Sequence, residues 1–303
     1  MAASAYTTSA KVLIFGAAGQ VGHALSELLE QAPGIEPVAL SRRQADITDA
    51  AVVQQQLQKH LPDYVVNCAA YNRVDAAERQ QEQAYAINRD GAEQLAKACA
   101  GLSIPLLHLS SDYVFDGHYA SGYSEEDEAS PLGVFGSSKW QGEEVIRAIQ
   151  PQHLILRVSW IFSTRGENYL LRTLEQARHE ALIDAADDRR GCPTSADDVA
   201  RVVLAILRQL TCGIDVWGTY HYCGAEITTR YGFSEALIAA ARQYEALKVE
   251  QLNAVASANL SILAQRPASS VLKCRKLLDT FGIRQRPWRS ELQRTIREFY
   301  GEH

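Results

Sequence analysis

Short apolar runs alternate with segments of helical periodicity through the first half of the chain. The apolar runs cover residues 11–16, 36–41, 63–70, 104–111 and 153–160, and the helical patterns cover 20–31, 84–100 and 136–149. Near-continuous apolar runs separated by helices are typical of a parallel sheet with helices on both faces. We therefore predict an α/β fold built on a doubly wound parallel sheet.

The pattern loosens from about residue 161. It predicts helices near 167–179, 196–210, 229–243 and 289–300, and short strands near 181–184 and 218–222. We expect a first domain over residues 1–165 and a smaller C-terminal lobe over 166–303, with segments near 190–222 returning to the first domain. Since the sequence shows no repeat or low-complexity linker, any hinge between the two parts is short.

Composition and charge exclude several classes of protein. A chain of 303 residues with 47% apolar residues can bury a large core. The net charge of −6 argues against a nucleic-acid binder, because such proteins need a basic surface to displace counterions. The start of the sequence lacks a leader pattern and no apolar stretch reaches about 18 residues, so we expect a cytoplasmic protein with no membrane partner.

Cysteine spacing indicates reduced thiols. The cysteines are scattered and form no CxxC pair: Cys68, Cys99, Cys192, Cys212, Cys223 and Cys274. A strand would place His221 and Cys223 on one face, as a pair of metal ligands requires, but no second pair accompanies them. We therefore predict free thiols and no bound metal.

A glycine pattern follows the first predicted strand. Gly16, Gly19 and Gly22 stand at the end of that strand and in the start of the next helix, together with Gln20 and Val21. In a Rossmann-type site such glycines permit a tight turn, close approach of a pyrophosphate and close packing of helix on strand. The spacing GxxGxxG differs from GxGxxG, yet strand, glycines and helix in this order predict a dinucleotide site.

The cofactor is predicted to be NADP. Ser41, Arg42 and Arg43 follow the second strand, where an NAD site usually offers an acidic residue, and guanidinium donors match the oxygens of a 2′-phosphate. The alternative is that the two arginines only solvate a loop. By position alone, Asp46 and Ile47 would lie beside the adenine.

Residues at the ends of the third and fourth strands complete the candidate site, because ligands of such sheets bind beyond the carboxyl ends of the strands. Ser111 and Asp112 end the fourth strand, where a hydroxyl group can donate a hydrogen bond to a substrate carbonyl. The segment that would run under the nicotinamide ribose consists of Cys68, Ala69, Ala70 and Tyr71.

Phe135 and Lys139 bear on whether the site can catalyse carbonyl reduction. Residues four apart on a helix share one face, so both side chains are expected in the same cleft. In a large class of nicotinamide enzymes a tyrosine stands four residues before such a lysine and supplies the proton that completes carbonyl reduction. Phenylalanine has no proton to give.

Motifs along nearly the whole chain resemble the extended short-chain dehydrogenase/reductases. They include GAAGQVG, ADITD, VVNCAAYNRVDAAE, LSSDYVFDG and YSEEDEASPLGVFGSSKWQGEE, followed by RRGCPTSADDVA, GTYHYCG, AQRPASSVL and FGIRQRPWRSEL. The last four are specific, since a generic dinucleotide fold would not contain them. Within this group the sequence is similar to the dTDP-4-dehydrorhamnose reductase family.

The resemblance implies transfer of a hydride from NADPH to the C4 ketone of a dTDP-linked 6-deoxyhexulose. Ser111 and Lys139 stand at the family's catalytic positions, Phe135 replaces its tyrosine, and Arg189 stands where glutamine is usual, which bears on the identity of the sugar. The positions that resemble nucleotide-sugar contacts are Ser111, Asp112, Trp160, Asn168, Arg266 and Trp288. Members of the family can also form homodimers.

Phe135 leaves three interpretations open. It is a change introduced to trap a complex, or a natural enzyme takes its proton from water, Ser111, Tyr113 or Tyr71, or the protein binds NADP without catalysis. The third interpretation has a parallel in a relative, the regulatory β-subunit of methionine adenosyltransferase. We predict an NADPH-dependent reductase of a nucleotide sugar that is impaired by Phe135, with a non-catalytic binding or regulatory protein as the alternative.

Overall fold

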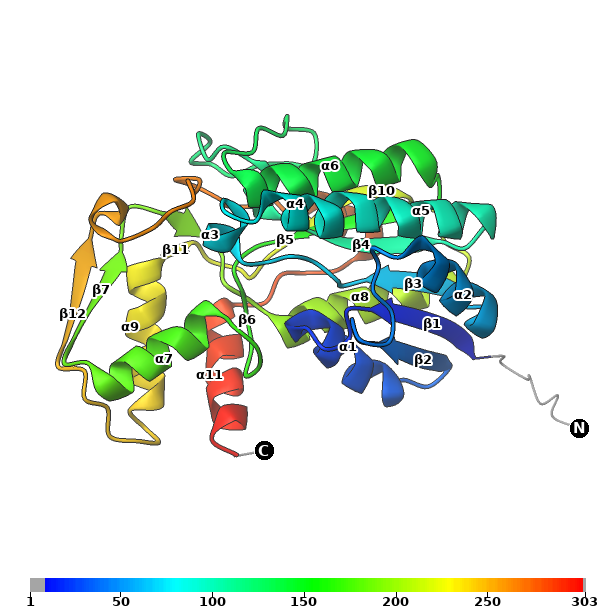
Figure 1. Ribbon diagram of the computed structural model, residues 1–303. Helices are drawn as coiled ribbons and strands as arrows, with labels where there is room; N and C mark the ends of the chain where they lie inside the picture. Colours follow the sequence, from blue (N-terminus) through cyan, green and yellow to red (C-terminus); the bar gives the residue numbers. More distant parts are fainter. Residues whose placement is uncertain (1–8, 302–303) are drawn as a thin grey trace, which may run out of the picture.

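The computed structural model describes residues 9–301. Residues 1–8, which contain most of the polar start used above to argue against a leader, and residues 302–303 lie outside the described part. Six parallel strands form the central sheet in the order β10-β5-β4-β3-β1-β2 (Figure 1). Their bounds are β1 (Ala10–Phe15), β2 (Ile35–Leu40), β3 (Tyr64–Asn67), β4 (Leu106–Ser111), β5 (His153–Val158) and β10 (Gly218–Tyr222). The predicted parallel α/β fold is confirmed.

The strand order determines where a ligand can bind. The chain runs outward from β1 to β2 and then returns to β3 on the other side of β1. The carboxyl ends of β1 and β3 therefore flank the point at which the strand order reverses, and open α/β sheets bind ligands at such a point.

Alternate residues of β1 bury themselves in two different layers. Val12 and Ile14 join one hydrophobic cluster with helices α1 (Gln20–Glu30) and α8 (Ala196–Thr211). Leu13 and Phe15 join a second cluster on the opposite face with α2 (Ala50–His60), α5 (Gly91–Gly101) and α6 (Val134–Ile149). This double burial is why the strands read as continuous apolar runs.

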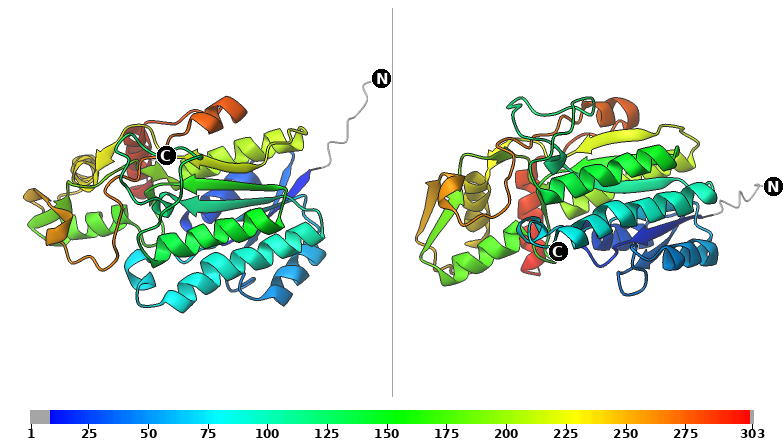
Figure 2. Two further views of the ribbon diagram at one scale, coloured as in Figure 1. Left: turned by 90° about the horizontal axis from the view of Figure 1, so that it is seen from above. Right: turned by 45° about the horizontal axis from the view of Figure 1, so that its top comes forward.

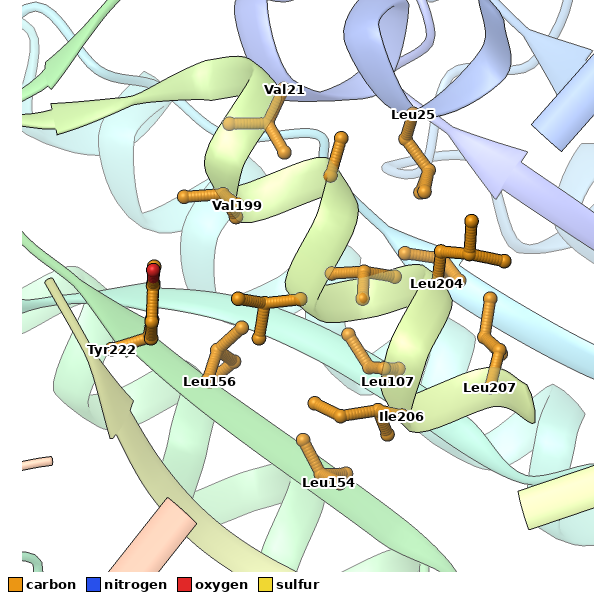
Figure 3. Packing of buried hydrophobic residues seen from close by; sticks show 14 of the residues in the cluster. Val21, Leu25, Leu107, Leu154, Leu156, Val199, Leu204, Ile206, Leu207 and Tyr222 are labelled. Carbon is orange, nitrogen blue, oxygen red and sulfur yellow. The ribbon is translucent and has the colours of Figure 1, made fainter. Parts of the chain in front are cut away.

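The core between α1 and α8 is made of branched aliphatic side chains. Figure 3 shows Leu204 and Leu207 of α8 between Leu25 of α1 and the sheet residues Leu107 and Leu154. Helix α8 follows residue 165 in the sequence and yet packs on the first helix, as strand β10 packs beside β5. The C-terminal half of the chain therefore contributes to the central sheet and its cover.

The remaining elements form a smaller lobe beside the carboxyl ends of the strands (Figures 1 and 2). Helices α7 (Tyr169–His179), α9 (Arg230–Ala241) and α11 (Trp288–Phe299) pack there against one another and beside the parallel pair β7 (Leu182–Ala186) and β12 (Gln251–Val255). Short strands pair as β6 (Ile161–Phe162) with β9 (Thr194–Ser195) and β8 (Arg190–Gly191) with β11 (Thr228–Thr229). Other short helices are α3 (Val74–Ala77), α4 (Gln81–Tyr85), α10 (Arg275–Phe281), Asp112–Val114 and Ser257–Asn259.

The helix predicted over 84–100 is interrupted. A π-helical segment, Ala86–Asp90, separates α4 from α5. Its Asn88 is buried and accepts a hydrogen bond from the backbone N–H of Tyr71 at 2.8 Å, while its Nδ2 donates to Ser138 Oγ at 3.0 Å. The wider turn thus coincides with a side chain that ties the loop after β3 to α6.

Within residues 9–301 no helix is both long and apolar enough to cross a membrane. The same described residues contain no group of three or more His, Cys, Asp or Glu side chains arranged to hold a metal ion. All six cysteines are free thiols.

Candidate active site

The loop after β1 is folded against the loop after β3. Gly16 has a φ of +77°, and a Cβ placed there would lie 2.4 Å from the backbone nitrogen of Ala69. A Cβ on Gly22 would lie 2.3 Å from the carbonyl oxygen of Gly16. Glycine is therefore required sterically at both positions, and the backbone stays bare at the predicted pyrophosphate site.

The N-terminus of α1 has the features of an anion-binding site. Its N-cap, Gly19, provides no side-chain hydrogen bond, and the first turn contains no acidic residue. Gln20 accepts a hydrogen bond from Ser163 Oγ at 2.8 Å, whereas Val21 is buried in the core. Unpaired N–H groups and the helix dipole favour a phosphate at this position, so the residues present fit a dinucleotide.

The segment after β2 presents two exposed arginines, of which Arg42 is paired with a carboxylate. Arg42 Nε pairs with Asp46 Oδ2 at 3.0 Å, and Arg43 is exposed. Ser41 donates to Gln44 Oε1 through its backbone N–H at 2.9 Å and through its hydroxyl at 2.6 Å. Ile47 is buried. The segment adjoins the β1 loop, because the backbone N–H of Ala17 donates to the carbonyl of Leu40 at 3.1 Å.

The segment 68–71 lies at the reversal point of the sheet. The backbone N–H of Cys68 donates to the carbonyl of Phe15, and burial raises the pKa of the Cys68 thiol to about 12. Tyr71 is buried, with its hydroxyl donating to Gln80 Oε1 at 2.7 Å. Ala69 and Ala70 are half-buried between them.

Ser111 and Asp112 at the end of β4 and Ser159 after β5 form a hydrogen-bonded polar group in the candidate site. Ser111 Oγ donates to Asp112 Oδ1 at 3.0 Å and accepts from the backbone N–H of Tyr113 at 3.2 Å. Ser159 Oγ donates to the other oxygen of Asp112 at 2.9 Å. Burial raises the pKa of Asp112 to about 6, against hydrogen bonds from Ser270, Ser159 and Ser111 that lower it.

Helix α6 brings Phe135 and Lys139 to the same region. Phe135 is 7% exposed, and its ring meets that of Tyr113 edge to face. Lys139 is 2% exposed and donates from Nζ to the carbonyl of Leu109 at 2.6 Å. The two residues thus share one buried helical face beside β4.

Arginines gather around Tyr113. The guanidinium groups of Arg189, Arg230 and Arg266 all act on the phenol of Tyr113, and burial is the larger influence and raises its pKa. Arg230 stacks over the ring of Trp160 at 3.7 Å, and Arg266 binds Asp75 with two hydrogen bonds of 3.0 and 2.6 Å. Such a cluster fits a diphosphate, because guanidinium groups bind phosphate oxygens in pairs.

Two sequence-predicted substrate residues are engaged elsewhere. Asn168 caps α7: its Oδ1 accepts from Leu171 N at 3.0 Å, and its Nδ2 donates to the carbonyl of Arg165 at 2.9 Å. Trp288 is 1% exposed and packs on Phe233 in the core of the smaller lobe. The structure does not bring these two side chains together with Ser111 and Lys139.

Three polar residues of this region were missed from the sequence. Arg230 opens α9 and reaches Trp160, while Asn67 and His108 lie completely buried in β3 and β4 behind Lys139. A histidine inside the apolar run of β4 was the only signal for this pair, and a polar residue in a doubly buried strand needs a partner.

The chain is similar to known proteins along nearly its whole length. A family model described as RmlD substrate binding domain matches residues 10–300. A dTDP-4-dehydrorhamnose reductase of Sinorhizobium fredii is 35% identical over 290 residues, which cover 94% of this chain and 96% of the relative.

Two solved structures have the same fold. A dTDP-4-dehydrorhamnose reductase from Clostridium acetobutylicum superposes with a TM-score of 0.87 at 30% identity, covering 94% of this chain and 98% of that one. A dTDP-4-dehydrorhamnose reductase from Bacillus anthracis, in complex with NADP, superposes with a TM-score of 0.86 at 29% identity, covering 96% and 99%.

Proposed function

The chain belongs to the dTDP-4-dehydrorhamnose reductase family of NADP-dependent oxidoreductases, and from this membership we propose that it reduces the C4 ketone of a dTDP-linked 6-deoxyhexulose with NADPH, at a rate limited by Phe135. One observation carries the proposal. Helix α6 places Phe135, whose ring contacts that of Tyr113, on the same buried face as Lys139, which donates to the carbonyl of Leu109 in β4.

The chain's own residues prepare the site for both ligands. When bound, NADPH supplies the hydride. Gly16 and the N-terminus of α1 would hold its pyrophosphate, and Arg42 and Arg43 its 2′-phosphate. Arg189, Arg230 and Arg266 would hold the diphosphate of the nucleotide sugar. Of these, Arg266 is a sequence-based candidate, and Arg189 and Arg230 are added from the structure.

Phe135 removes the usual proton donor, and the alternative donors are engaged. The hydroxyl of Tyr71 donates to Gln80, that of Ser111 donates to Asp112, and burial raises the pKa of Tyr113. We therefore expect the proton to come from water. Loss of a positioned general acid costs about 10²- to 10⁴-fold in rate, so slow turnover remains.

The test is oxidation of NADPH in the presence of dTDP-4-dehydrorhamnose, with the reduced sugar identified by mass spectrometry. We expect slow turnover that requires the sugar and is lost in Lys139→Met. A rate equal to that without sugar would contradict the proposal.

Phe135 itself favours a second candidate, a protein that binds NADP and a sugar nucleotide without reducing the sugar. Calorimetric titration separates the two functions. Binding of NADPH and dTDP together with an inert enzyme, even after Phe135→Tyr, would support the non-catalytic protein.

Location and assembly complete the proposal. All six cysteines are free, as in proteins of reducing compartments, which supports a cytoplasmic protein. The homodimer implied by the resemblance is tested by light scattering coupled to size-exclusion chromatography, in which a mass near 33.4 kDa would contradict it.

A further inference from the structure

Asn67, His108 and Lys139 form a buried hydrogen-bond chain that links β3, β4 and α6. Nδ2 of Asn67 lies 2.9 Å from Nδ1 of His108, and Nε2 of His108 lies 3.2 Å from Nζ of Lys139. The exposed fractions of the three residues are 1%, 1% and 2%. Because each group sits in a low-dielectric interior, each proton in the chain must have an acceptor.

Asn67 determines which groups donate and which accept along this hydrogen-bond chain. The backbone N–H of Ala69 donates to Oδ1 of Asn67 at 3.0 Å. A flipped amide would set two donors against each other there, so Nδ2 faces His108. Nδ1 of His108 must then accept, and a neutral imidazole with an accepting Nδ1 carries its single proton on Nε2.

The Nε2–H group of His108 points at Nζ of Lys139. An ammonium group has three donors and no acceptor, whereas a neutral amine has one lone pair. Nζ can therefore complete the chain only as an amine, with one of its own hydrogens donated to the carbonyl of Leu109.

We propose that Asn67, acting through His108, holds Lys139 as a neutral amine in the cofactor-free protein, and that binding of NADPH returns a proton to it. The proton uptake on NADPH binding, the second half of this proposal, rests on the proposed function. The neutral state of Lys139 in the free protein, the first half, does not. Asn67 and His108 are positioning residues in this scheme, since they act through Lys139.

The charged and titratable groups around Lys139 are compatible with this assignment. Burial lowers the pKa of Lys139 to about 8, and the nearby Glu143 and Cys68 oppose the change. The charge of Glu143 is already matched by Arg157 and Arg147.

The two groups on the strand side are neutral. Burial raises the pKa of the Cys68 thiol to about 12, so this group carries no charge that would hold an ammonium. Burial also lowers the pKa of His108 well below its usual value, and the charge of Arg147 adds to the effect.

Cofactor binding would favour the protonated form of Lys139 over the neutral amine. The phosphates of NADPH bring negative charge, and its ribose hydroxyls accept hydrogen bonds from an ammonium group, so both favour the protonated form of Lys139. Binding should therefore take up a proton from solution.

The first test is direct observation of the His108 tautomer by ¹⁵N NMR of histidine-labelled protein at pH 9, above the pKa of about 8 of Lys139, with the His108 signals assigned from His108→Gln. We expect a protonated Nε2 and an accepting Nδ1. A proton on Nδ1, or a doubly protonated ring, would overturn the proposal.

Asn67→Asp reverses the polarity at nearly constant volume. A carboxylate accepts from both Ala69 N–H and His108 Nδ1–H, so the proton of His108 should move to Nδ1. Asn67→Ala removes the donor without adding charge and should also abolish the strict Nε2–H tautomer. Asn88→Asp makes the same change at a buried asparagine bonded to Tyr71 and Ser138, and should leave His108 unchanged. An unaltered tautomer in both Asn67 variants would overturn the proposal.

The second test is calorimetric titration of NADPH at pH 8 in two buffers of different ionisation enthalpy. Because Lys139 with a pKa of about 8 is half protonated at pH 8, we expect uptake of about 0.5 proton per NADPH in the original protein and close to none in Asn67→Asp. Binding without uptake in the original protein would overturn the second half. An absence of NADPH binding would instead refute the proposed function, with the tautomer result still valid.

Discussion

The rings of Phe135 and Tyr113 pack edge to face with their centroids 5.7 Å apart and their planes at 75°. Both line a small hollow between α6 and the loop that carries Pro267. Edge-to-face pairs of this kind are stabilising, so Phe135 has a defined place in the wall of the site.

Phe135→Tyr should raise the rate of ketone reduction by at least ~10²-fold, because it restores a phenol four residues before Lys139 on the same helical face. The measurement is kcat/KM for NADPH oxidation with dTDP-4-dehydrorhamnose. Phe135→Leu is the control, since it also alters the ring contact but adds no acid. A tyrosine variant no faster than the leucine variant would show that the missing proton was not the defect.

The strands and the glycine loop could be predicted from local sequence because their signals are local. Leu13 and Phe15 face one layer and Val12 and Ile14 the other, which leaves a continuous apolar run in the sequence. Gly16 is required by its own backbone angle.

Other features depend on partners far away in the chain and could not be predicted. The surroundings of Trp288 are one such feature, since its ring packs in a core formed by α7, α9 and α11. The role of His108 depends on its contacts with Asn67 and Lys139, which lie 41 and 31 residues away. Pairing across such distances is set by tertiary packing.

Glu143→Ala should lower the free energy of unfolding by about 3 to 5 kcal/mol, because it leaves a buried guanidinium unpaired. Glu143 is completely buried and accepts hydrogen bonds from Arg157 Nη2 at 2.7 Å and from Ser110 Oγ at 2.5 Å. Urea unfolding measures the effect. Glu144, the residue after Glu143, is exposed and pairs with Arg147 at the surface. Glu144→Ala should therefore lower the free energy of unfolding by less than about 1 kcal/mol. Equal losses in the two variants would contradict the buried pair.

Asp112 should make stability depend on pH. Its pKa is raised by burial to about 6 from a usual value of 3.8, so its contribution is fully present below about pH 4 and is lost as the pH rises through 6. With about 1.4 kcal/mol for each pKa unit, the loss is about 3 kcal/mol. Asp112→Asn cannot ionise, so its urea unfolding should lack this decline. Parallel curves for both proteins between pH 4 and 8 would refute the assignment.

Arg43→Ala should weaken binding of NADPH by roughly tenfold or more and leave NADH unaffected, because only NADPH has a 2′-phosphate for the exposed guanidinium to bind. Titration calorimetry of both cofactors measures the difference, which should narrow in high salt. Arg275→Ala removes an exposed arginine of α10 and serves as the control. An equal loss for NADH and NADPH would remove Arg43 from the cofactor site.

Arg266→Ala should weaken binding of dTDP by about 1 to 3 kcal/mol if its guanidinium contacts the diphosphate. The structure adds a competitor to this prediction, since Asp75 holds the same guanidinium with two hydrogen bonds. Asp75→Asn therefore separates ligand binding from structural support. It weakens the ion pair and leaves the arginine in place, so affinity for dTDP should stay constant or rise, whereas Arg266→Ala should lower it. If both variants lose affinity to the same extent, the pair supports the loop at 263–267 and the diphosphate is bound by Arg189 and Arg230 instead.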